Sequence, residues 1–257
     1  MSDGPKNLMP GEFWDNEYYG DPSLPLAPSD SFSYERTLAA GLRDMAPVSS
    51  GQTVVEIGCA PARWLLWYAR TFGARVSGLE YSVKGAALSR ANLAAAGITP
   101  DIEEADFFDT DLDTGAKDLV LSLGFIEHFD DLERAFRRHL DFCAPGGRVA
   151  IGVPNFRGFT GLMQRWASPG FLAAHNTAAM DPALFERFAS SAGWTMEGHR
   201  YLDSFEPRII HVERRGPAAV LLPLMPLRRL RWTDKINHPR LSSYLLMTFR
   251  QQRPVTA

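Results

Sequence analysis

Residues 53–62 read Thr-Val-Val-Glu-Ile-Gly-Cys-Ala-Pro-Ala, and this stretch decides the fold. Its first half is short and rich in β-branched residues, which is typical of a buried strand in a parallel sheet. Its second half is a turn of small residues, where the backbone can approach a ligand closely. The sequence therefore predicts a strand that enters a helix through a ligand-binding turn.

The same alternation of strand and helix continues along the chain. The expected strands are residues 53–57, 75–79, 101–105, 118–123, 148–153, 194–201 and 242–250, and the expected helices between them are residues 62–72, 84–96, 131–143 and 181–192. Strands at this spacing require crossover connections, which favours an open sheet covered by helices on both faces. The pattern thus predicts an α/β fold with a seven-stranded, Rossmann-like sheet.

Two regions flank or interrupt this alternation. Residues 1–46 are expected to form an N-terminal arm and cap helix, and residues 47–257 the main domain. Residues 155–179 and 205–240 are too long for plain connections and are expected to be insertions that shape an acceptor site or the surface. The second of them lies before the last strand.

The composition excludes several classes of protein. Hydrophobic residues make up 45% of the 257 residues and charged residues 22%, as in globular proteins, so a disordered or fibrous chain is not expected. The net charge is −3, but it is unevenly distributed along the chain. Residues 1–199 carry a net charge of −10, and residues 200–257 carry a net charge of +7. The acidic first part argues against a groove that follows nucleic-acid phosphates.

Cysteine use and the terminal sequence bear on location. Cys59 and Cys143 have no companion Cys or His at metal-site spacing, and two cysteines are too few for a disulfide scaffold. The N-terminus lacks the features of a signal peptide, and no apolar run is long enough to span a membrane. A cytoplasmic protein without a metal site is expected.

Polar and aromatic residues follow the ends of several expected strands. Glu80 ends the second strand, where its carboxylate can accept hydrogen bonds from both hydroxyls of a ribose. Asp106 and Phe107 end the third strand and suit the exocyclic amine and the ring of a base. Only Gly58 of the three glycines in a dinucleotide fingerprint is present, which disfavours a pyrophosphate. Because parallel strands end at one edge, the sequence predicts a nucleoside site there.

With these motifs in place, the chain resembles the class I S-adenosylmethionine-dependent methyltransferases over roughly residues 50–155. The matching motifs are Val-Val-Glu-Ile-Gly-Cys-Ala-Pro at 54–61, Gly-Leu-Glu-Tyr-Ser at 78–82, Ala-Asp-Phe-Phe at 105–108, the segment 118–129, and Ala-Pro-Gly-Gly-Arg-Val at 144–149. The one departure is Ala62, where the family commonly has glycine. Its methyl group is expected to narrow the turn.

The resemblance implies that the cofactor is S-adenosyl-L-methionine, which leaves as S-adenosyl-L-homocysteine, and that no metal is required. The residues it assigns to the cofactor are Glu56, Gly58, Cys59, Ala60, Glu80, Tyr81, Asp106, Phe107, Ser122 and Gly124. Within this set, Glu56 and the backbone of 58–60 are expected at the methionine end. Glu80 is expected at the ribose, and the adenine is expected between Tyr81 and Phe107 with its amine on Asp106.

The acceptor site is predicted beside the fourth strand. His128 follows that strand and is the candidate general base, although such a histidine can also be a turn residue satisfied by its neighbours. The candidate substrate-binding residues are Trp14, Tyr18, Phe125, Asn155 and His175. For Trp14 and Tyr18 the alternative is a hydrophobic clasp, and for His175 it is a loop-stabilising role.

The sequence therefore predicts transfer of a methyl group to a small molecule, at an oxygen of a hydroxyl or carboxyl group. The alternatives are a nitrogen acceptor, an RNA acceptor bound by the basic C-terminal region, and a non-catalytic cofactor-binding protein. Residues 218–232 combine apolar and arginine side chains, so peripheral contact with a membrane is a further alternative to a packed excursion or subunit contact. The chain is expected to be a monomer or a homodimer.

Overall fold

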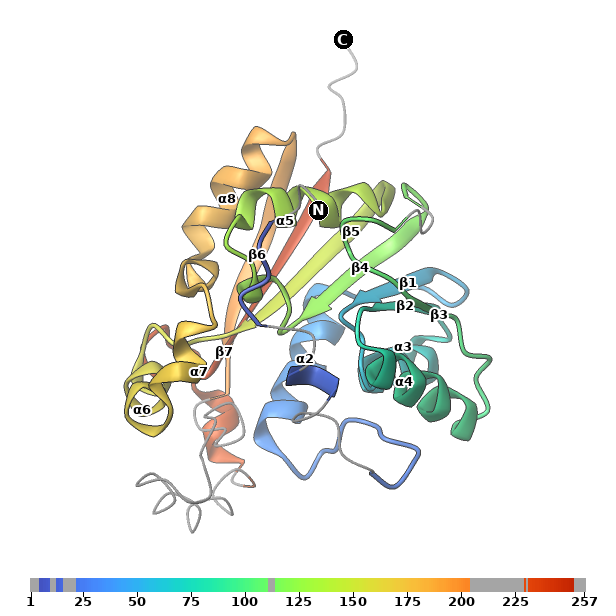
Figure 1. Cartoon of the computed structure of the whole chain (residues 1–257), viewed down its shortest axis with the longest axis horizontal. Coiled ribbons are helices and arrows are strands. Elements are labelled where there is room, and N and C mark those ends of the chain that lie inside the picture. The colour runs from blue at the N-terminus through green and yellow to red at the C-terminus, as the bar shows by residue number, and fades with distance from the viewer. Residues whose placement is uncertain are drawn as a thin grey trace.

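A seven-stranded sheet runs through the computed structural model, which describes residues 5–9, 13–15, 22–110, 114–203, 229 and 231–251 (Figure 1). The strands are β1 (Thr53–Ile57), β2 (Arg75–Glu80), β3 (Ile102–Glu104), β4 (Lys117–Leu123), β5 (Cys143–Pro154), β6 (Trp194–Leu202) and β7 (Tyr244–Gln251). Their spatial order is β3-β2-β1-β4-β5-β7-β6. The expected seven-stranded α/β fold is confirmed.

Strand direction determines where a ligand can bind. All neighbouring strands are parallel from β3 to β5, and only β7 runs antiparallel to its neighbours β5 and β6. Ile57 at the end of β1 is in register with Leu79 of β2 and Ser122 of β4. The carboxyl ends of these three strands therefore meet at one edge of the sheet, where open α/β folds bind their ligands.

Helices cover both faces of the sheet. The helices are α2 (Ser33–Met45), α3 (Arg63–Phe72), α4 (Val83–Ala95), α5 (Leu132–Asp141), α6 (Phe159–Ala167), α7 (Pro169–Ala173) and α8 (Pro182–Ser191). Buried side chains of α2, α3 and α4 pack in one core cluster, and those of α5 and α8 pack in another. The central strands are thus buried on both faces, as their apolar sequences predict.

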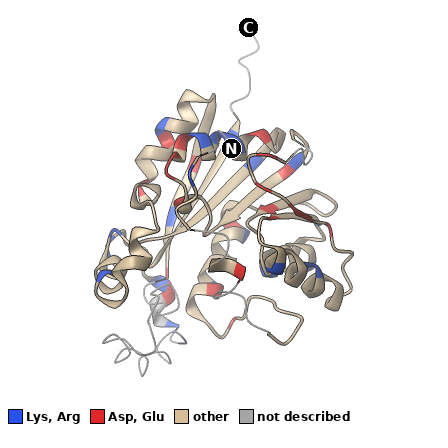
Figure 2. Cartoon of the chain, in the orientation of Figure 1, with Lys and Arg blue, Asp and Glu red and all other residues tan. Residues whose placement is uncertain are grey.

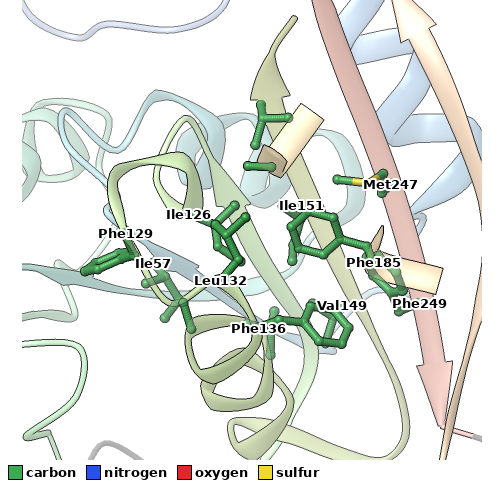
Figure 3. Close-up of a cluster of buried hydrophobic side chains, with 14 of the residues drawn as sticks. Ile57, Ile126, Phe129, Leu132, Phe136, Val149, Ile151, Phe185, Met247 and Phe249 are labelled. Carbon is green, nitrogen blue, oxygen red and sulfur yellow. The ribbon is translucent and has the colours of Figure 1, made fainter. Parts of the chain in front are cut away.

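Side chains alternate between the two clusters along each strand. Val55 and Ile57 of β1 point into the cluster with α5 and α8, whereas Val54 points into the other cluster. Figure 3 shows the first cluster, in which Phe136 of α5 lies next to Phe249 of β7. The strand period of two places apolar residues on both sides of the sheet and so joins the helix layers into one domain.

Most elements lie within two residues of their expected bounds, and three differences bear on the fold. Helix α2, the expected cap helix, begins at Ser33, because its polar first turn is held by distant residues: Arg36 pairs with Asp234, and Glu35 pairs with Arg63. Strand β3 is shorter than expected. The turn at 145–147 lies within β5, whose first residue pairs with the start of β4.

The two expected insertions differ in how far the structure describes them. Residues 155–179 contain α6, α7 and most of the 3₁₀ turn η3 (Thr177–Met180), so this segment is helical. Residues 205–240 lie mainly outside the described residues, apart from a short stretch that includes η5 (Trp232–Lys235). Most of the basic and apolar segment 218–232 also falls there, so its RNA-binding and membrane-binding alternatives stay predictions. The division into residues 1–46 and 47–257 likewise stays a prediction.

Charged residues are interspersed on the described surface. Figure 2 shows both acidic and basic residues on the helices and loops that flank the sheet. Several of these residues form ion pairs, including Arg200 with Asp44 and Arg148 with Glu197. Among the described helices, none has the length and hydropathy needed to cross a bilayer.

The aromatic centre of the first core cluster gives a stability prediction. Phe136 is fully buried, and its ring lies edge-on to Phe185 and Phe249 at centroid distances of 5.6 and 4.9 Å. Replacing it by alanine leaves a cavity, so we expect Phe136→Ala to lower the free energy of unfolding by about 3 to 5 kcal/mol in urea titrations. Exposed Leu162 of α6 is the control, and Leu162→Ala should change stability by less than about 0.5 kcal/mol. Equal effects of both substitutions would contradict this account of the core.

Candidate active site

A cavity of about 350 Å³ lies at the carboxyl ends of β1, β2 and β4. Its walls include the turn after β1, the end of β2 and the 3₁₀ turn η2 (Ile126–His128) after β4. Residues of the N-terminal arm and of the segment after β5 complete it. The volume and the convergence of polar groups are typical of a small-molecule site.

The turn after β1 is shaped by close contact with an aromatic ring. Gly58 has φ +68°, and a Cβ atom added there would lie 2.6 Å from the ring of Phe125. Ala62 adopts the left-handed conformation with φ 61° and forms the N-cap position of α3, with its methyl group buried in the core. The methyl group of Ala62 therefore packs into the core, and it is the missing side chain at Gly58 that keeps the turn open.

Glu80 joins the ends of two strands. One oxygen of its carboxylate accepts a hydrogen bond from the backbone N–H of Ala60 at 3.1 Å, and the other accepts one from Ser82 at 2.9 Å. The side chain is 6% exposed and lines the cavity. Burial raises the pKa of the carboxyl, and the two backbone hydrogen bonds oppose that rise. Each oxygen retains acceptor capacity for a ligand hydroxyl.

A second polar group lies at the cavity wall after β4. Glu127, His128 and His175 are 1, 5 and 8% exposed, and each offers one atom, a carboxylate oxygen or an imidazole nitrogen, within 4.8 Å of the others. Two of these residues belong to η2, and His175 comes from the turn between α7 and η3. The backbone N–H of Asn176 donates to the carbonyl of Glu127 at 2.7 Å, which joins the two segments.

Burial governs the protonation of this group. It raises the pKa of the Glu127 carboxyl to about 8, because a carboxylate is poorly solvated there. Burial, together with the neighbouring His175, lowers the pKa of His128 to about 3, and burial also lowers the pKa of His175. Both imidazoles are therefore neutral at pH 7, and each has a nitrogen lone pair.

The N-terminal arm borders the same wall. The backbone N–H of Leu8 donates to the carbonyl of His128 at 2.7 Å, and the Trp14 ring lies edge-on to the His128 ring at 5.4 Å. Asp15 then accepts a hydrogen bond from the hydroxyl of Ser82 at the end of β2. The described part of the arm thus connects the two polar ends of the cavity and contributes an indole to its lining.

Comparison with known proteins agrees with this geometry. A family profile described as a methyltransferase domain matches residues 55–151, which run from β1 to β5 and carry the turn, Glu80 and η2. Residues 55–151 therefore form a methyltransferase domain, and its fold is that of the class I S-adenosylmethionine-dependent methyltransferases. The family expected from the sequence motifs is confirmed.

Similarity extends beyond the matched domain. The chain is 26% identical to methyltransferase GfsG of Streptomyces halstedii, over 96% of this chain and 91% of that protein. It is 24% identical to 27-O-demethylrifamycin SV methyltransferase of Amycolatopsis mediterranei, over 79% of this chain and 80% of that protein. A geranyl diphosphate C-methyltransferase structure from Streptomyces coelicolor matches with a TM-score of 0.61 at 16% identity, over 94% of this chain and 97% of that one. The methyltransferase fold therefore spans nearly the whole chain.

Most of the site residues predicted for the methyltransferase meet at the cavity. Those that line it are Trp14, Gly58, Ala60, Glu80, Tyr81, Phe107, Gly124, Phe125, His128 and His175. Tyr81 is 58% exposed, whereas Phe107 is buried among other aromatic rings. Tyr18 lies outside the described residues. The roles of these residues stay predictions, but their convergence on one edge follows from the sheet topology.

Five predicted residues are not in the cavity lining: Glu56, Cys59, Asp106, Ser122 and Asn155. The Asn155 amide donates to the carbonyls of Pro239 and Ser242, so it holds the segment before β7 instead of facing an acceptor. The Cys59 thiol is buried beside Ser89, which leaves only its backbone for a cofactor role. Burial raises the pKa of the Glu56 carboxyl well above its usual range, and the N–H of Leu65 binds it.

Several residues of the lining had no predicted role, and three of them carry polar groups. Glu127 is adjacent to His128, and its burial is a feature of the 3₁₀ turn that its neighbours in sequence did not indicate. Arg63 at the start of α3 lines the cavity and pairs with Glu35 of α2 at 3.0 Å. Tyr34 of α2 lines it too. Arg63 directly follows the small-residue turn, and this position in the sequence could have indicated that it lines the cavity.

The turn at Gly58 gives a prediction with a matched control. Gly58→Ala should weaken binding of S-adenosylhomocysteine in calorimetry, because the new methyl group meets the Phe125 ring. Gly97, after α4, has a similar φ of +76° with no atom within 4 Å of an added Cβ. Both substitutions should cost roughly 1 to 2 kcal/mol of stability from backbone strain, and Gly58→Ala should cost more because of the contact with Phe125, but Gly97→Ala should leave binding unchanged. Equal binding by the two variants would remove the turn from the cofactor site.

Proposed function

We propose that the protein transfers a methyl group from S-adenosylmethionine to an oxygen atom of a small organic molecule. The observation that supports this most is that one cavity holds two polar ends. Glu80 and the Gly58 turn form one end, and Glu127, His128 and His175 form the other. The first end suits a nucleoside and the second suits an acceptor that carries a hydroxyl proton.

The residues at the first end fit the cofactor. Gly58 presents bare backbone to the cavity beside the Phe125 ring, and both oxygens of Glu80 keep acceptor capacity for ribose hydroxyls. Arg63 lines the same cavity and brings a cation suited to the carboxylate of a methionyl group. When bound, S-adenosylmethionine supplies a methyl group on a positively charged sulfur, ready for displacement.

The residues at the second end fit a hydroxyl acceptor. The Nδ1 atom of His128 lies 3.3 Å from the carbonyl oxygen of Ala174, which can only accept, so Nδ1 carries the proton and Nε2 has the lone pair. That lone pair can accept the hydrogen bond of a hydroxyl and orient its oxygen. The apolar faces of Trp14, Phe156 and Phe171 also line the cavity, and they exclude water from the reacting atoms.

The relatives support an oxygen acceptor without deciding it. 27-O-demethylrifamycin SV methyltransferase is named for an oxygen, whereas the geranyl diphosphate enzyme is named for a carbon. The polar cluster favours oxygen here because transfer to a hydroxyl releases a proton that a neighbouring group must receive. The carbon of an alkene carries no acidic proton that it could donate to His128 before the methyl group is transferred.

Glu80 tests the cofactor end. Glu80→Ala removes the acceptor for the ribose hydroxyls, and we expect about a 10- to 100-fold loss of S-adenosylhomocysteine affinity by calorimetry, the range for hydrogen bonds to a charged group. Glu104 is exposed at the end of neighbouring β3, so Glu104→Ala should bind normally. Unchanged affinity in Glu80→Ala would exclude this residue from the site.

His128 tests the acceptor end. A screen of phenols, alcohols, carboxylic acids and amines with labelled cofactor should give a product methylated at oxygen, identified by mass spectrometry and NMR. With that acceptor, His128→Ala should lower kcat by about 10²- to 10⁴-fold, while S-adenosylhomocysteine affinity changes little. Methylation at nitrogen would overturn the oxygen assignment, and a near-normal kcat would remove His128 from the chemistry.

A further inference from the structure

The cluster of Glu127, His128 and His175 combines ligand atoms that protein metal sites use. One carboxylate oxygen and two imidazole nitrogens, all on buried residues, lie within 4.8 Å of one another. A divalent transition ion binds such atoms at about 2.0 to 2.2 Å, so small side-chain rotations suffice for the three to share one ion. The cluster does not follow the Cys and His spacing of metal-binding sequence motifs, because His175 comes from a segment that is distant in sequence from Glu127 and His128.

Each of the two imidazoles has its Nδ1 atom next to a backbone carbonyl. Nδ1 of His128 faces the carbonyl of Ala174, and Nδ1 of His175 faces the carbonyl of Phe171 at 2.7 Å. A carbonyl accepts a proton and cannot donate one, so both histidines carry hydrogen on Nδ1 and a lone pair on Nε2. Metal-binding histidines almost always donate their second N–H to a carbonyl or carboxylate in this way.

One oxygen of the Glu127 carboxylate lacks a hydrogen-bond partner among the described residues, although the backbone N–H of Glu127 binds the carboxylate. Its Oε2 atom is buried and forms no hydrogen bond with the described residues, and no arginine or lysine among them pairs with it. An unpaired buried carboxylate is costly unless a proton or a cation neutralises it. Gly124 leaves room beside it, because a Cβ at that position would lie 3.7 Å from Oε1.

We propose that Glu127, His128 and His175 bind one divalent transition-metal ion. Two imidazoles favour ions such as Zn²⁺ or Fe²⁺ over Mg²⁺ and Ca²⁺, which prefer oxygen ligands. Three protein ligands leave a coordination position open to the cavity, as in catalytic metal sites. The ion is a property of this chain's own cluster, since methyl transfer in the family does not depend on a metal.

The open position gives the ion a role in the proposed reaction, and this part of the inference rests on the proposed function. A hydroxyl acceptor bound there becomes more acidic and loses its proton to solvent. The oxygen then forms a bond to the methyl carbon, while the carbon–sulfur bond breaks and its electron pair stays on sulfur. With the ion bound, the Nε2 lone pair of His128 is used by the ion, so the ion replaces the direct hydrogen bond between His128 and the acceptor hydroxyl.

Metal binding can be measured without any acceptor. The full chain, freed of affinity tag and treated with chelator, should bind one equivalent of Zn²⁺ in calorimetry and give the visible absorption of tetrahedral or five-coordinate Co²⁺. His175→Ala and Glu127→Gln should weaken Zn²⁺ binding more than about 100-fold, because losing even an outer-shell partner costs about 10- to 100-fold. Zn²⁺ should raise the Tm of the wild type and not that of the variants.

A matched control separates this site from surface imidazoles. His199 is exposed on β6, away from the cavity, so His199→Ala should keep the wild-type affinity and Co²⁺ spectrum. The metal site would be overturned if the wild type bound no Zn²⁺, or if His175→Ala and Glu127→Gln bound Zn²⁺ with the same affinity as His199→Ala. Glu127→Gln keeps the shape of the side chain and serves if His175→Ala fails to fold.

The same samples distinguish this inference from the proposed function. S-adenosylhomocysteine should bind to the chelated protein, because Glu80 and Gly58 do not contribute to the cluster. Chelation should lower the methylation rate, and Zn²⁺ or Fe²⁺ should restore it. An unchanged rate after complete chelation would overturn the role of the ion while leaving methyl transfer to an oxygen intact, whereas absence of cofactor binding would instead count against the proposed function.

Discussion

The site depends on the two hydrogen bonds that the carboxylate of Glu80 accepts. It binds the backbone N–H groups of Ala60 and Ser82, so it connects the turn after β1 with the end of β2. Parallel pairing of β1 with β2 brings these groups together, since Ile57 lies in register with Leu79. A buried carboxylate requires such partners, and the two hydrogen bonds offset part of the cost of its burial.

The second end of the cavity depends on segments that are distant in sequence. Backbone hydrogen bonds attach Leu8 of the arm to His128, and Asn176 of the insertion to Glu127. The Asn176 amide also donates to the carbonyl of Phe129, at 3.0 Å. These bonds hold three separate segments around one group of side chains. The end of the cavity with Glu127, His128 and His175 is therefore formed by tertiary contacts between segments that lie at the edge of the sheet.

This difference explains which parts could be predicted from the sequence. The turn at 53–62, the position of Glu80 and the alternation of strands and helices follow from local patterns and from the rule that parallel strands end at one edge. The buried position of Glu127 and the contact of His175 with His128 depend on how the segment after β5 folds back, which no local pattern determines. Asn155 shows the same limit, because its partners, the carbonyls of Pro239 and Ser242, lie far along the chain.

The two ends of the cavity also differ in what a change of sequence can alter. At the end that carries Glu80, the wall consists of a strand-end carboxylate, the backbone N–H groups that it binds and a glycine turn, so most substitutions there disturb the sheet edge itself. At the acceptor end, side chains on the arm, η2 and the segment after β5 make the contacts, and these segments border the sheet without forming it. Acceptor choice can therefore change through these side chains while the fold and the cofactor site are retained. The low identity to relatives with different acceptors, at nearly full coverage of the fold, agrees with this division.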